Sequence, residues 1–306
     1  MRVLWLLLLP LLLFARSPLA PIPQKVPYDK ELAELGKVLF FDPMLSSDRS
    51  VSCASCHKPE HGGADDKPLS IGVGGQKGDL NSPTVYNSFF NFAQFWNGRV
   101  ATLQEQTLGP LHNSKEMNMS DSLLLTRLQN SPYYPKAFEE IFGSQKITID
   151  MVTKAIAEFE KALYTPNSKF DRFLRKETTL SPKEHKGYLL FKELGCITCH
   201  NGINIGGNSF QKIGTVIPYQ GPSPHDRYEV TKNPDHKGVY KVPTLRNIAL
   251  TAPYFHDGSV STLRQAIKKM SYHNLGFRLT PEEQEALVAF LHTLTGQQPA
   301  ILQEGK

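Results

Sequence analysis

The 306-residue sequence contains only four cysteines, and after its first twenty residues it has no apolar run long enough to cross a bilayer. Its net charge of +5 is mild, and it lacks clusters of Lys and Arg interleaved with aromatic side chains. Proteins that bind nucleic acid need such basic clusters, so the composition gives no case for that function. The length allows one large domain or two of ordinary size.

The first residues predict a secretory signal peptide, residues 1–20, with cleavage after Ala20. Arg2 supplies a positive start, Val3 to Phe14 form an apolar run broken by Pro10, and a small-residue exit follows. This run is shorter than the roughly 20 residues that a membrane-spanning helix needs. We therefore expect the mature chain to be soluble and outside the cytoplasm; an uncleaved N-terminal anchor is the alternative.

The four cysteines form two CxxC pairs, and a histidine directly follows each pair. Exported proteins usually place a few cysteines in disulfides, and four would allow three connectivities. A zinc ribbon needs two pairs about 15–20 residues apart, whereas these pairs start at positions 53 and 196. In CxxCH, two thioethers tether a haem and the histidine becomes the proximal iron ligand. The sequence therefore predicts two covalently bound haems c, on Cys53, Cys56 and His57 and on Cys196, Cys199 and His200.

Helical patterns flank each of these motifs. Before the second motif, Ser181-Pro-Lys-Glu offers an N-cap, a proline at the first position and an acid two residues later. After it, Thr280-Pro-Glu-Glu starts another helix, whose apolar spacing continues to Leu294 and which Gly296 is expected to end. Residues 28–41 and 149–163 repeat this arrangement more loosely around the first motif. A helix, CxxCH, a long loop with an axial ligand and a second helix are typical of a class I cytochrome c module.

We therefore expect a mainly α protein with long loops, made of two class I cytochrome c-like domains that each hold one covalent haem. The segment Tyr164-Thr-Pro-Asn-Ser favours a boundary between them. The expected domains are residues 21–164 and residues 165–306. Many glycines and prolines in the loops suit domains in which a haem supplies much of the buried apolar surface.

Several long motifs resemble the bacterial dihaem cytochrome c peroxidases and their relatives. They are "LFFDPMLSSDRSVSCASCH", "GGADDKPLSIGVGGQKGDLNSPTVYNSFFNFAQFWNGRVATLQEQTLGPLHNSKEM" and "VPTLRNIALTAPYFHDGSVSTLRQAIKKM", in the same order as in that family. The resemblance covers nearly all of the mature chain. It implies that the N-terminal haem is the low-potential, peroxidatic site and that the C-terminal haem is the high-potential site that receives electrons.

The resemblance also implies that Gln106 and Glu116 are the distal pair over the peroxidatic iron. A carboxylate suits this role because it can take the proton of the iron-bound peroxide oxygen and return it to the leaving oxygen. Gln106 would orient the peroxide by hydrogen bonding. Without the resemblance, Gln and Glu would be ordinary at a helix end followed by a solvated loop.

The remaining site residues also follow from the resemblance. Trp96 corresponds to the family's tryptophan on the electron path between the haems, and Phe95 would wall the distal pocket; a Phe-Trp pair is otherwise usually core. Met270 matches the axial methionine of the second iron, and a thioether ligand raises a haem potential. Met270 in the core, with His256 or His273 as the ligand, is the alternative. The family holds a calcium ion between its domains, and Asn81 (side chain), Thr251 and Pro253 (carbonyls) stand at those positions.

One position departs from the family pattern. In many members a histidine in the loop after S-x-G ligates the peroxidatic iron in the fully oxidised enzyme and must leave before peroxide binds. Val73 stands at that position, and valine cannot coordinate iron. Either another residue blocks the site, with His61 and His112 nearest in sequence, or the site is always open. We expect the open site.

The function that the resemblance implies is that of a periplasmic dihaem peroxidase, which reduces hydrogen peroxide to two waters. The electron donor would be a small cytochrome c or a blue copper protein, and dimerisation is usual in the family. Two alternatives remain. A relative that oxidises residues of a partner protein would carry a tyrosine where Met270 stands, and a non-catalytic dihaem electron carrier would have no use for Gln106 and Glu116.

Overall fold

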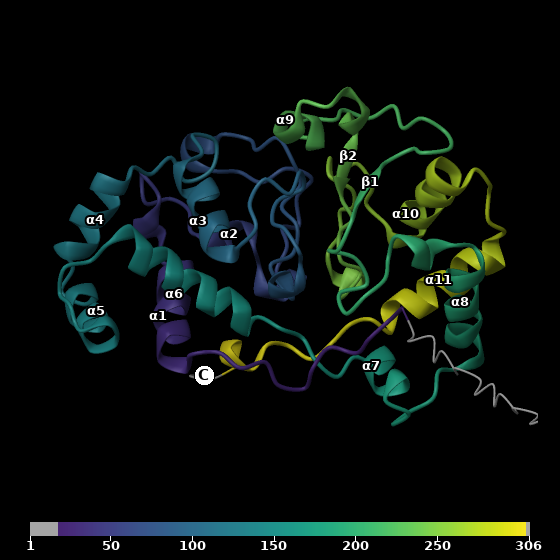
Figure 1. Ribbon diagram of the computed structural model, residues 1–306, viewed down its shortest axis with the longest axis horizontal. Coiled ribbons are helices and arrows are strands. Elements are labelled where there is room, and N and C mark those ends of the chain that lie inside the picture. Colours follow the sequence, from purple (N-terminus) through teal and green to yellow (C-terminus); the bar gives the residue numbers. More distant parts are fainter. Residues whose placement is uncertain (1–17, 304–306) are drawn as a thin grey trace, which may run out of the picture.

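The computed structural model describes residues 18–303, so the predicted signal peptide lies outside the described residues apart from its last three positions. The molecule is elongated, with two mainly helical halves side by side (Figure 1). We call residues 30–162 the N-terminal half and residues 169–292 the C-terminal half. Within the described residues, no helix is long and apolar enough to span a membrane.

The N-terminal half is built around two packed helices, α1 (Lys30–Phe41) and α6 (Ile149–Ala162). Asp29 caps α1 by accepting from the Leu32 amide, and Thr148 caps α6 by accepting from Met151. Their apolar faces meet in a core that includes Leu39, Phe40, Ile156 and Phe159. The remaining helices of this half are α2 (Cys53–Cys56), α3 (Leu103–His112), α4 (Asp121–Gln129) and α5 (Tyr134–Phe142).

The C-terminal half repeats this plan with α8 (Pro182–Glu193) packed on α11 (Pro281–His292). Capping boxes start both helices, at Ser181 with Glu184 and at Thr280 with Glu283, as the sequence predicted. A short antiparallel pair, β1 (Phe210–Lys212) and β2 (Val239–Lys241), lies near the N-terminal half (Figure 1). The other helices are α7 (Lys169–Leu174), α9 (Arg227–Thr231) and α10 (Leu263–Met270). A short π-helix, Ser271–Leu275, directly follows α10.

Each helix pair crosses at a glycine. A Cβ on Gly36 would lie 1.9 Å from the Ala155 carbonyl oxygen, and a Cβ on Gly187 would lie 1.9 Å from that of Ala286. In both halves the next side chain met is a phenylalanine of the partner helix, Phe159 or Phe290. Glycine is therefore needed at both positions for the backbones to approach this closely.

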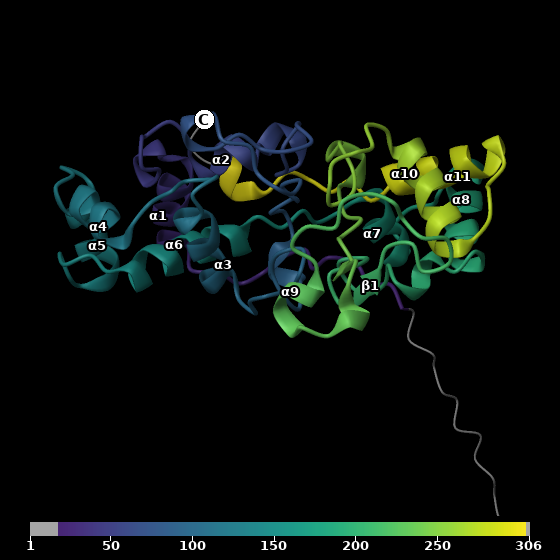
Figure 2. The ribbon, with the colours of Figure 1, turned by 90° about the horizontal axis from the view of Figure 1, so that it is seen from above.

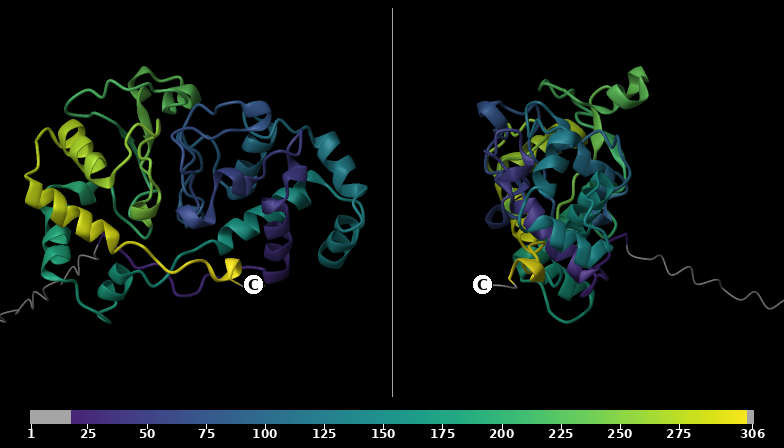
Figure 3. Two further views of the ribbon diagram at one scale, coloured as in Figure 1. Left: turned by 180° about the vertical axis from the view of Figure 1, so that it is seen from behind. Right: turned by 90° about the vertical axis from the view of Figure 1, so that its left-hand side faces the viewer.

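The two ends of the described chain pack on opposite halves. Leu19 is buried in the hydrophobic cluster of the C-terminal half, and the carbonyl of Ala20 accepts from Arg246 Nη2 at 2.8 Å. Ile301 is buried in the cluster of the N-terminal half, and its carbonyl accepts from Lys37 Nζ at 2.6 Å. Figures 2 and 3 show the C-terminal segment running from one half to the other.

The predicted fold class, mainly α with long loops in two cytochrome c-like units, is confirmed. One helix end was predicted wrongly: α11 ends at His292, and Gly296 lies three residues beyond its Thr293 cap. Gly296 instead approaches Thr165, whose carbonyl oxygen would be 2.2 Å from a Cβ there. The exact division at residues 164 and 165 stays a prediction.

Candidate active site

Both CxxCH motifs form a short helical turn, α-helical in the first (Cys53–Cys56) and 3-10 in the second (Cys196–Thr198). The His57 amide donates to the Cys53 carbonyl at 2.9 Å, and the His200 amide donates to the Cys196 carbonyl at 3.0 Å. This turn places the two thiols of each motif close together, with the imidazole directly after them. All four cysteines, which lie within the described residues, are free thiols. The motifs are therefore shaped for two thioether bonds each.

The two imidazoles are partly buried, and their surroundings favour the neutral form that haem iron ligands need. Burial lowers the pKa of His57, and it lowers the pKa of His200 to about 4. His57 Nδ1 lies 3.3 Å from the Gly63 carbonyl, which fixes the tautomer and leaves Nε2 for the iron. His200 Nδ1 is buried and has no hydrogen-bond partner among the described residues. These residues fit two covalent haems, with His57 and His200 as proximal ligands.

Helix α3 and the turn after it carry the predicted distal pair. Thr102 caps α3 through a capping box with Glu105, and Gln106 lies in its first turns. The chain then folds back along the helix, because the Met117 amide donates to the Pro110 carbonyl at 3.2 Å. This return places Glu116 beside α3.

Glu116 is a partly buried carboxyl close to the first haem motif. Burial raises its pKa, although a hydrogen bond from Asn113 Nδ2 to Oε1, at 2.6 Å, and the charge of Arg99 oppose this. Burial also raises the pKa of the Cys53 and Cys56 thiols. The charge of Glu160 adds more to the shift of Cys53, and that of Asp65 more to the shift of Cys56, than the charge of Glu116, which adds to both. The carboxyl therefore lies near the first CxxCH motif.

The loop that carries Val73 is packed against Glu116. The Val73 amide donates to the Glu116 carbonyl at 2.8 Å, and the Val73 side chain is buried. A Cβ on the preceding Gly72 would lie 2.2 Å from the Lys115 carbonyl oxygen, so this close approach requires glycine. The alternative blocking residues are held elsewhere: His112 Nε2 lies 2.6 Å from Asp121, and His61 Nε2 lies 3.8 Å from Asp66.

Trp96 lies between the two halves. Its indole Nε1 donates to the Asn81 carbonyl at 2.9 Å, and its own carbonyl accepts from the Lys241 amide of β2 at 2.7 Å. Phe95, beside it, has a positive φ of 66° and stacks its ring 3.2 Å from the Arg99 guanidinium carbon. The Trp96 ring therefore points from the N-terminal half toward the C-terminal half.

The turn around Trp96 has a counterpart in the C-terminal half that the sequence analysis missed. Gln94 bridges Val100 in one turn, Tyr254 bridges Val260 in the other, and His256 stands where Trp96 does. The second residue of each turn is a phenylalanine with a positive φ, 66° at Phe95 and 70° at Phe255. The sequence signal is the pair of patterns "PT..N" and "F..G.V", which "SPTVYNSFFNFAQFWNGRV" and "VPTLRNIALTAPYFHDGSV" share. These two segments have the same length and align without a gap.

Met270 is the last residue of α10 and is partly buried. The alternative ligands have contacts of their own. His256 Nε2 lies 2.7 Å from the Pro222 carbonyl, and His273 Nδ1 lies 3.0 Å from the Ile217 carbonyl. These contacts favour Met270, whose role as the ligand of the second iron stays a prediction.

Asn81 joins the two halves at the predicted calcium position. Its side-chain amide donates to the carbonyls of Lys67 and Pro68, at 3.1 and 3.3 Å, and its backbone amide donates to His256 at 2.8 Å. Thr251 and Pro253 lie on the same loop as His256. Within residues 18–303 there is no cluster of three or more His, Cys, Asp or Glu that could hold a metal, so any ion here depends on neutral oxygens.

A charged cluster next to Glu116 was also missed. Lys115 Nζ lies 2.7 Å from Asp79 Oδ1, and His225 Nε2 lies 3.3 Å from the other oxygen of the same carboxylate. His225 Nδ1 also lies 2.9 Å from Glu229. This cluster ties the turn of Glu116 to the C-terminal half.

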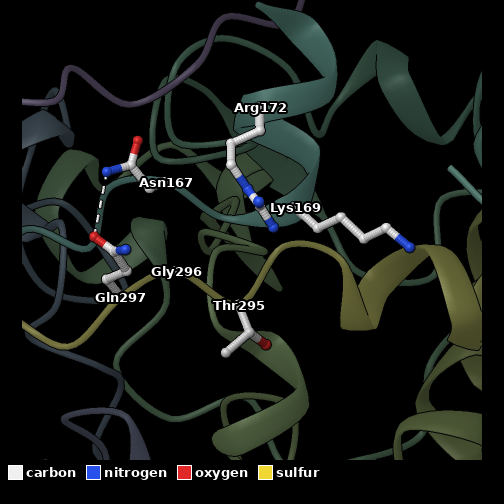
Figure 4. Close-up of a pocket in the computed structure, with 6 residues that line it drawn as sticks. All are labelled: Asn167, Lys169, Arg172, Thr295, Gly296 and Gln297. Carbon is white, nitrogen blue, oxygen red and sulfur yellow. Dashed lines mark hydrogen bonds between the residues drawn. The ribbon is translucent and has the colours of Figure 1, made fainter. Parts of the chain in front are cut away.

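A surface pocket of 580 Å³ lies away from these residues, where α7 begins and the chain leaves α11 (Figure 4). The Asn167 side chain donates to Gln297 across it at 3.2 Å, and Lys169 reaches out to Glu184. None of its lining residues was predicted to be functional. They are Asn167, Lys169, Arg172, Thr295, Gly296 and Gln297.

Two haem-binding turns on paired cytochrome c-like units, with a partly buried carboxyl by one and a tryptophan between the units, define a dihaem c-type protein. Residues 30–179 match the family described as di-haem cytochrome c peroxidase, and residues 185–295 match cytochrome c. The cytochrome c551 peroxidase of Nitrosomonas europaea is 47% identical over 93% of this chain and 86% of the relative. That of Pseudomonas aeruginosa is 42% identical over 92% and 85%. The chain belongs to the di-haem cytochrome c peroxidase family.

More distant relatives share the same architecture. The methylamine utilization protein MauG of Methylophilus methylotrophus is 31% identical over 92% of this chain and 88% of the relative. The crystal structure of a MauG-like protein associated with microbial copper homeostasis superposes with a TM-score of 0.81, at 29% identity, and covers 96% of each chain. The structure of the dihaem peroxidase BthA from Burkholderia thailandensis, at 22% identity and a TM-score of 0.74, shows the same fold and covers 88% of this chain and 87% of that one.

Proposed function

We propose that this protein reduces hydrogen peroxide to two waters with electrons from a small cytochrome c or a blue copper protein. The observation that carries the proposal is the partly buried Glu116 carboxyl, which lies near Cys53 and Cys56 and accepts a hydrogen bond from Asn113 at 2.6 Å. When bound, the haem on these cysteines supplies the iron at which peroxide binds and its O–O bond breaks. A neighbouring proton carrier is what that cleavage needs.

Glu116 acts as the proton carrier. As a carboxylate it takes the proton from the inner peroxide oxygen, and as the acid it gives that proton to the outer oxygen, which then leaves as water. Its surroundings suit both steps, since burial favours the acid and the Asn113 hydrogen bond favours the carboxylate. Gln106, on the adjoining helix, orients the peroxide by hydrogen bonding.

Electrons reach this site through the C-terminal half. His200 and Met270 hold the second haem, where a thioether ligand favours the reduced form and so suits a group that accepts electrons from an external donor. Trp96 lies between the two halves, with Asn81 and Lys241 fixing its ring and backbone, and provides the path inward. One peroxide needs two electrons, and two haems allow one of them to be stored.

The location, ion and assembly are part of the same proposal. The leader at residues 1–20 and the two CxxCH motifs favour export to the periplasm, because haem is attached to such motifs outside the cytoplasm. Calcium is proposed at Asn81, Thr251 and Pro253, and a homodimer as the assembled form. We propose the domain division at residues 21–164 and 165–306.

The alternatives are disfavoured by particular residues. An enzyme that oxidises residues of a partner protein is expected to have a tyrosine where Met270 stands. A simple electron carrier needs neither an open iron nor the Glu116 carboxyl beside it. Cyanide binding distinguishes the carrier from the peroxidase. Both irons of an oxidised carrier would be closed to cyanide, whereas a peroxidase with an open iron should bind it.

The decisive test is peroxide-dependent oxidation of a reduced small cytochrome c by the haem-loaded protein and by Glu116→Gln. Removing the proton carrier should lower turnover by about 10²–10⁴-fold while both haems stay bound. Glu140→Gln is the matched control, because this glutamate is exposed and its nearest cation, Lys136, is 4.0 Å away. Full activity in Glu116→Gln would remove the proton-transfer role.

A further inference from the structure

Trp96 is the first member of a chain of aromatic rings that enters the C-terminal half. The ring centroids of Trp96 and Tyr240 are 6.3 Å apart, and those of Trp96 and His256 are also 6.3 Å apart. Tyr240 and His256 stack on each other at 4.4 Å with an interplanar angle of 24°. All three side chains lie within the range in which aromatic rings interact directly.

Tyr219 continues this chain toward the surface. Its ring centroid is 6.1 Å from that of His256, and its side chain is partly exposed, whereas Tyr240 and His256 are buried. We call Trp96, Tyr240, His256 and Tyr219 the aromatic ladder. It connects the proposed electron path between the haems with a phenol that solvent can reach.

The two tyrosines of the ladder differ in what their hydroxyl groups meet. Tyr219 Oη donates to Asp257 Oδ2 at 2.8 Å, whereas Tyr240 Oη donates to the Pro224 carbonyl at 2.9 Å. A tyrosine that loses an electron also loses its phenolic proton, because the oxidised phenol is a strong acid. A carboxylate can accept that proton and a backbone carbonyl cannot. Tyr219 is therefore the residue of the ladder that can lose both an electron and its phenolic proton.

Two neighbouring contacts strengthen this assignment. Burial by itself raises the pKa of Asp257, but hydrogen bonds from Ser259 and Tyr219 outweigh it, so the group is a carboxylate at neutral pH. Lys269 Nζ lies 5.6 Å from the Tyr219 ring centroid. This positive charge disfavours a cationic ring, so the electron and the proton must leave together.

The matching turn of the N-terminal half provides an internal comparison. Asn97 stands where Asp257 stands, and its Oδ1 accepts from Arg99 Nη1 at 3.4 Å. A carboxamide cannot take up a proton at neutral pH. Only the turn of the C-terminal half therefore combines a phenol with a base.

We propose that the aromatic ladder removes oxidising equivalents from the peroxidatic site to Tyr219 when peroxide arrives and no donor is present. Peroxide takes up two electrons and two protons to form two waters. Without a donor, Tyr219 supplies one of these electrons, the bound haem would supply the other, and the two protons come from solvent water. The electron passes through His256 and Tyr240 to Trp96, the phenolic proton moves to Asp257, and a neutral tyrosyl radical remains at the surface. There an external reductant can quench it, which spares the buried residues.

This inference rests on the proposed function, and its test keeps the two apart. The oxidised holoprotein is mixed with peroxide without donor, frozen for electron paramagnetic resonance, and in parallel treated with a nitroso spin trap and mapped by peptide mass spectrometry. We expect a tyrosyl signal and a trap adduct on Tyr219. Tyr219→Phe and Asp257→Asn should each lower the signal at least several-fold, the second although the phenol is present. Tyr228→Phe, a partly exposed tyrosine outside the ladder, is the control and should leave it unchanged.

Turnover with a reduced cytochrome c is measured for every variant and should be unchanged. Signal and adducts that persist in Tyr219→Phe, or that depend equally on Tyr228, would overturn the ladder. Normal turnover with no tyrosyl signal in any variant would also overturn it and would leave the peroxidase function standing. Loss of both turnover and signal in the unaltered protein would overturn the proposed function as well.

Discussion

The backbone amide of Val73 donates a hydrogen bond to the carbonyl oxygen of Glu116 over 2.8 Å. This contact ties the loop in which many relatives carry an iron-binding histidine to the residue that we propose as the proton carrier. The loop is held further by the Gly74 amide, which donates to Asp48 at 3.1 Å, and by the burial of the Val73 side chain. Its conformation therefore needs no bond to iron.

The first prediction is that the oxidised protein is already open. It should bind cyanide at one iron, and it should turn over peroxide with a reduced cytochrome c without a lag, because Val73 cannot coordinate iron. Stopped-flow mixing of the fully oxidised and the one-electron-reduced protein measures this. Val73→His supplies the missing imidazole and should introduce a lag that prior reduction removes. An oxidised protein that is silent until reduced would mean that another residue closes the site.

The second prediction concerns the pH dependence of turnover. Glu116 must be a carboxylate to accept a proton, so kcat/KM should fall as pH decreases through its pKa, which burial raises. The Asn113 hydrogen bond favours the carboxylate and lowers that pKa. Asn113→Ala should therefore move the acid limb of the profile to higher pH.

The control for this shift is Ser114→Ala, a change at the next exposed residue. Its pH profile should match that of the unaltered protein. A limb that stays in place or moves to lower pH in Asn113→Ala would contradict the assignment of Glu116 as the titrating group.

The third prediction concerns the two helix crossings. Gly36→Ala and Gly187→Ala each place a Cβ 1.9 Å from a carbonyl oxygen of the partner helix. Alanine gains about 1 kcal/mol in helix propensity, but separating the helices should cost more, and we expect a net loss of about 1–3 kcal/mol in the free energy of unfolding. Chemical denaturation of the haem-loaded variants measures it.

Gly78→Ala is the matched control, because its Cβ would meet its nearest atom, the Ser70 carbonyl oxygen, at 3.7 Å. This variant should unfold like the unaltered protein. Unchanged stability in both crossing variants would show that the helices can move apart without cost.

The fourth prediction tests the second iron. Met270→His replaces a thioether with an imidazole, which stabilises ferric iron, so the potential of the C-terminal haem should fall while that of the N-terminal haem stays. A spectroscopic redox titration resolves the two. Lys268→His, an exposed position two residues earlier on α10, should leave both potentials in place. If the potential of the C-terminal haem were unchanged in Met270→His, Met270 would not be the ligand.

Local sequence patterns predicted much of the fold. The capping boxes at Ser181 and Thr280 start helices where they were predicted, because a cap depends on residues only three positions apart. The end of α11 was missed, since Gly296 is set by its approach to Thr165 rather than by the helix. Likewise the glycine crossings at Gly36 and Gly187 depend on a partner helix that follows 119 and 99 residues later, at Ala155 and Ala286.

The two CxxCH motifs determined from the sequence alone that the chain binds two haems, because covalent attachment depends on five adjacent residues. The tertiary structure decided what surrounds them. It brought Glu116 next to Val73, set Trp96 against His256, and placed Tyr219 on Asp257. These contacts join residues far apart in the chain, so they exist only once the helices have packed and the two halves have met.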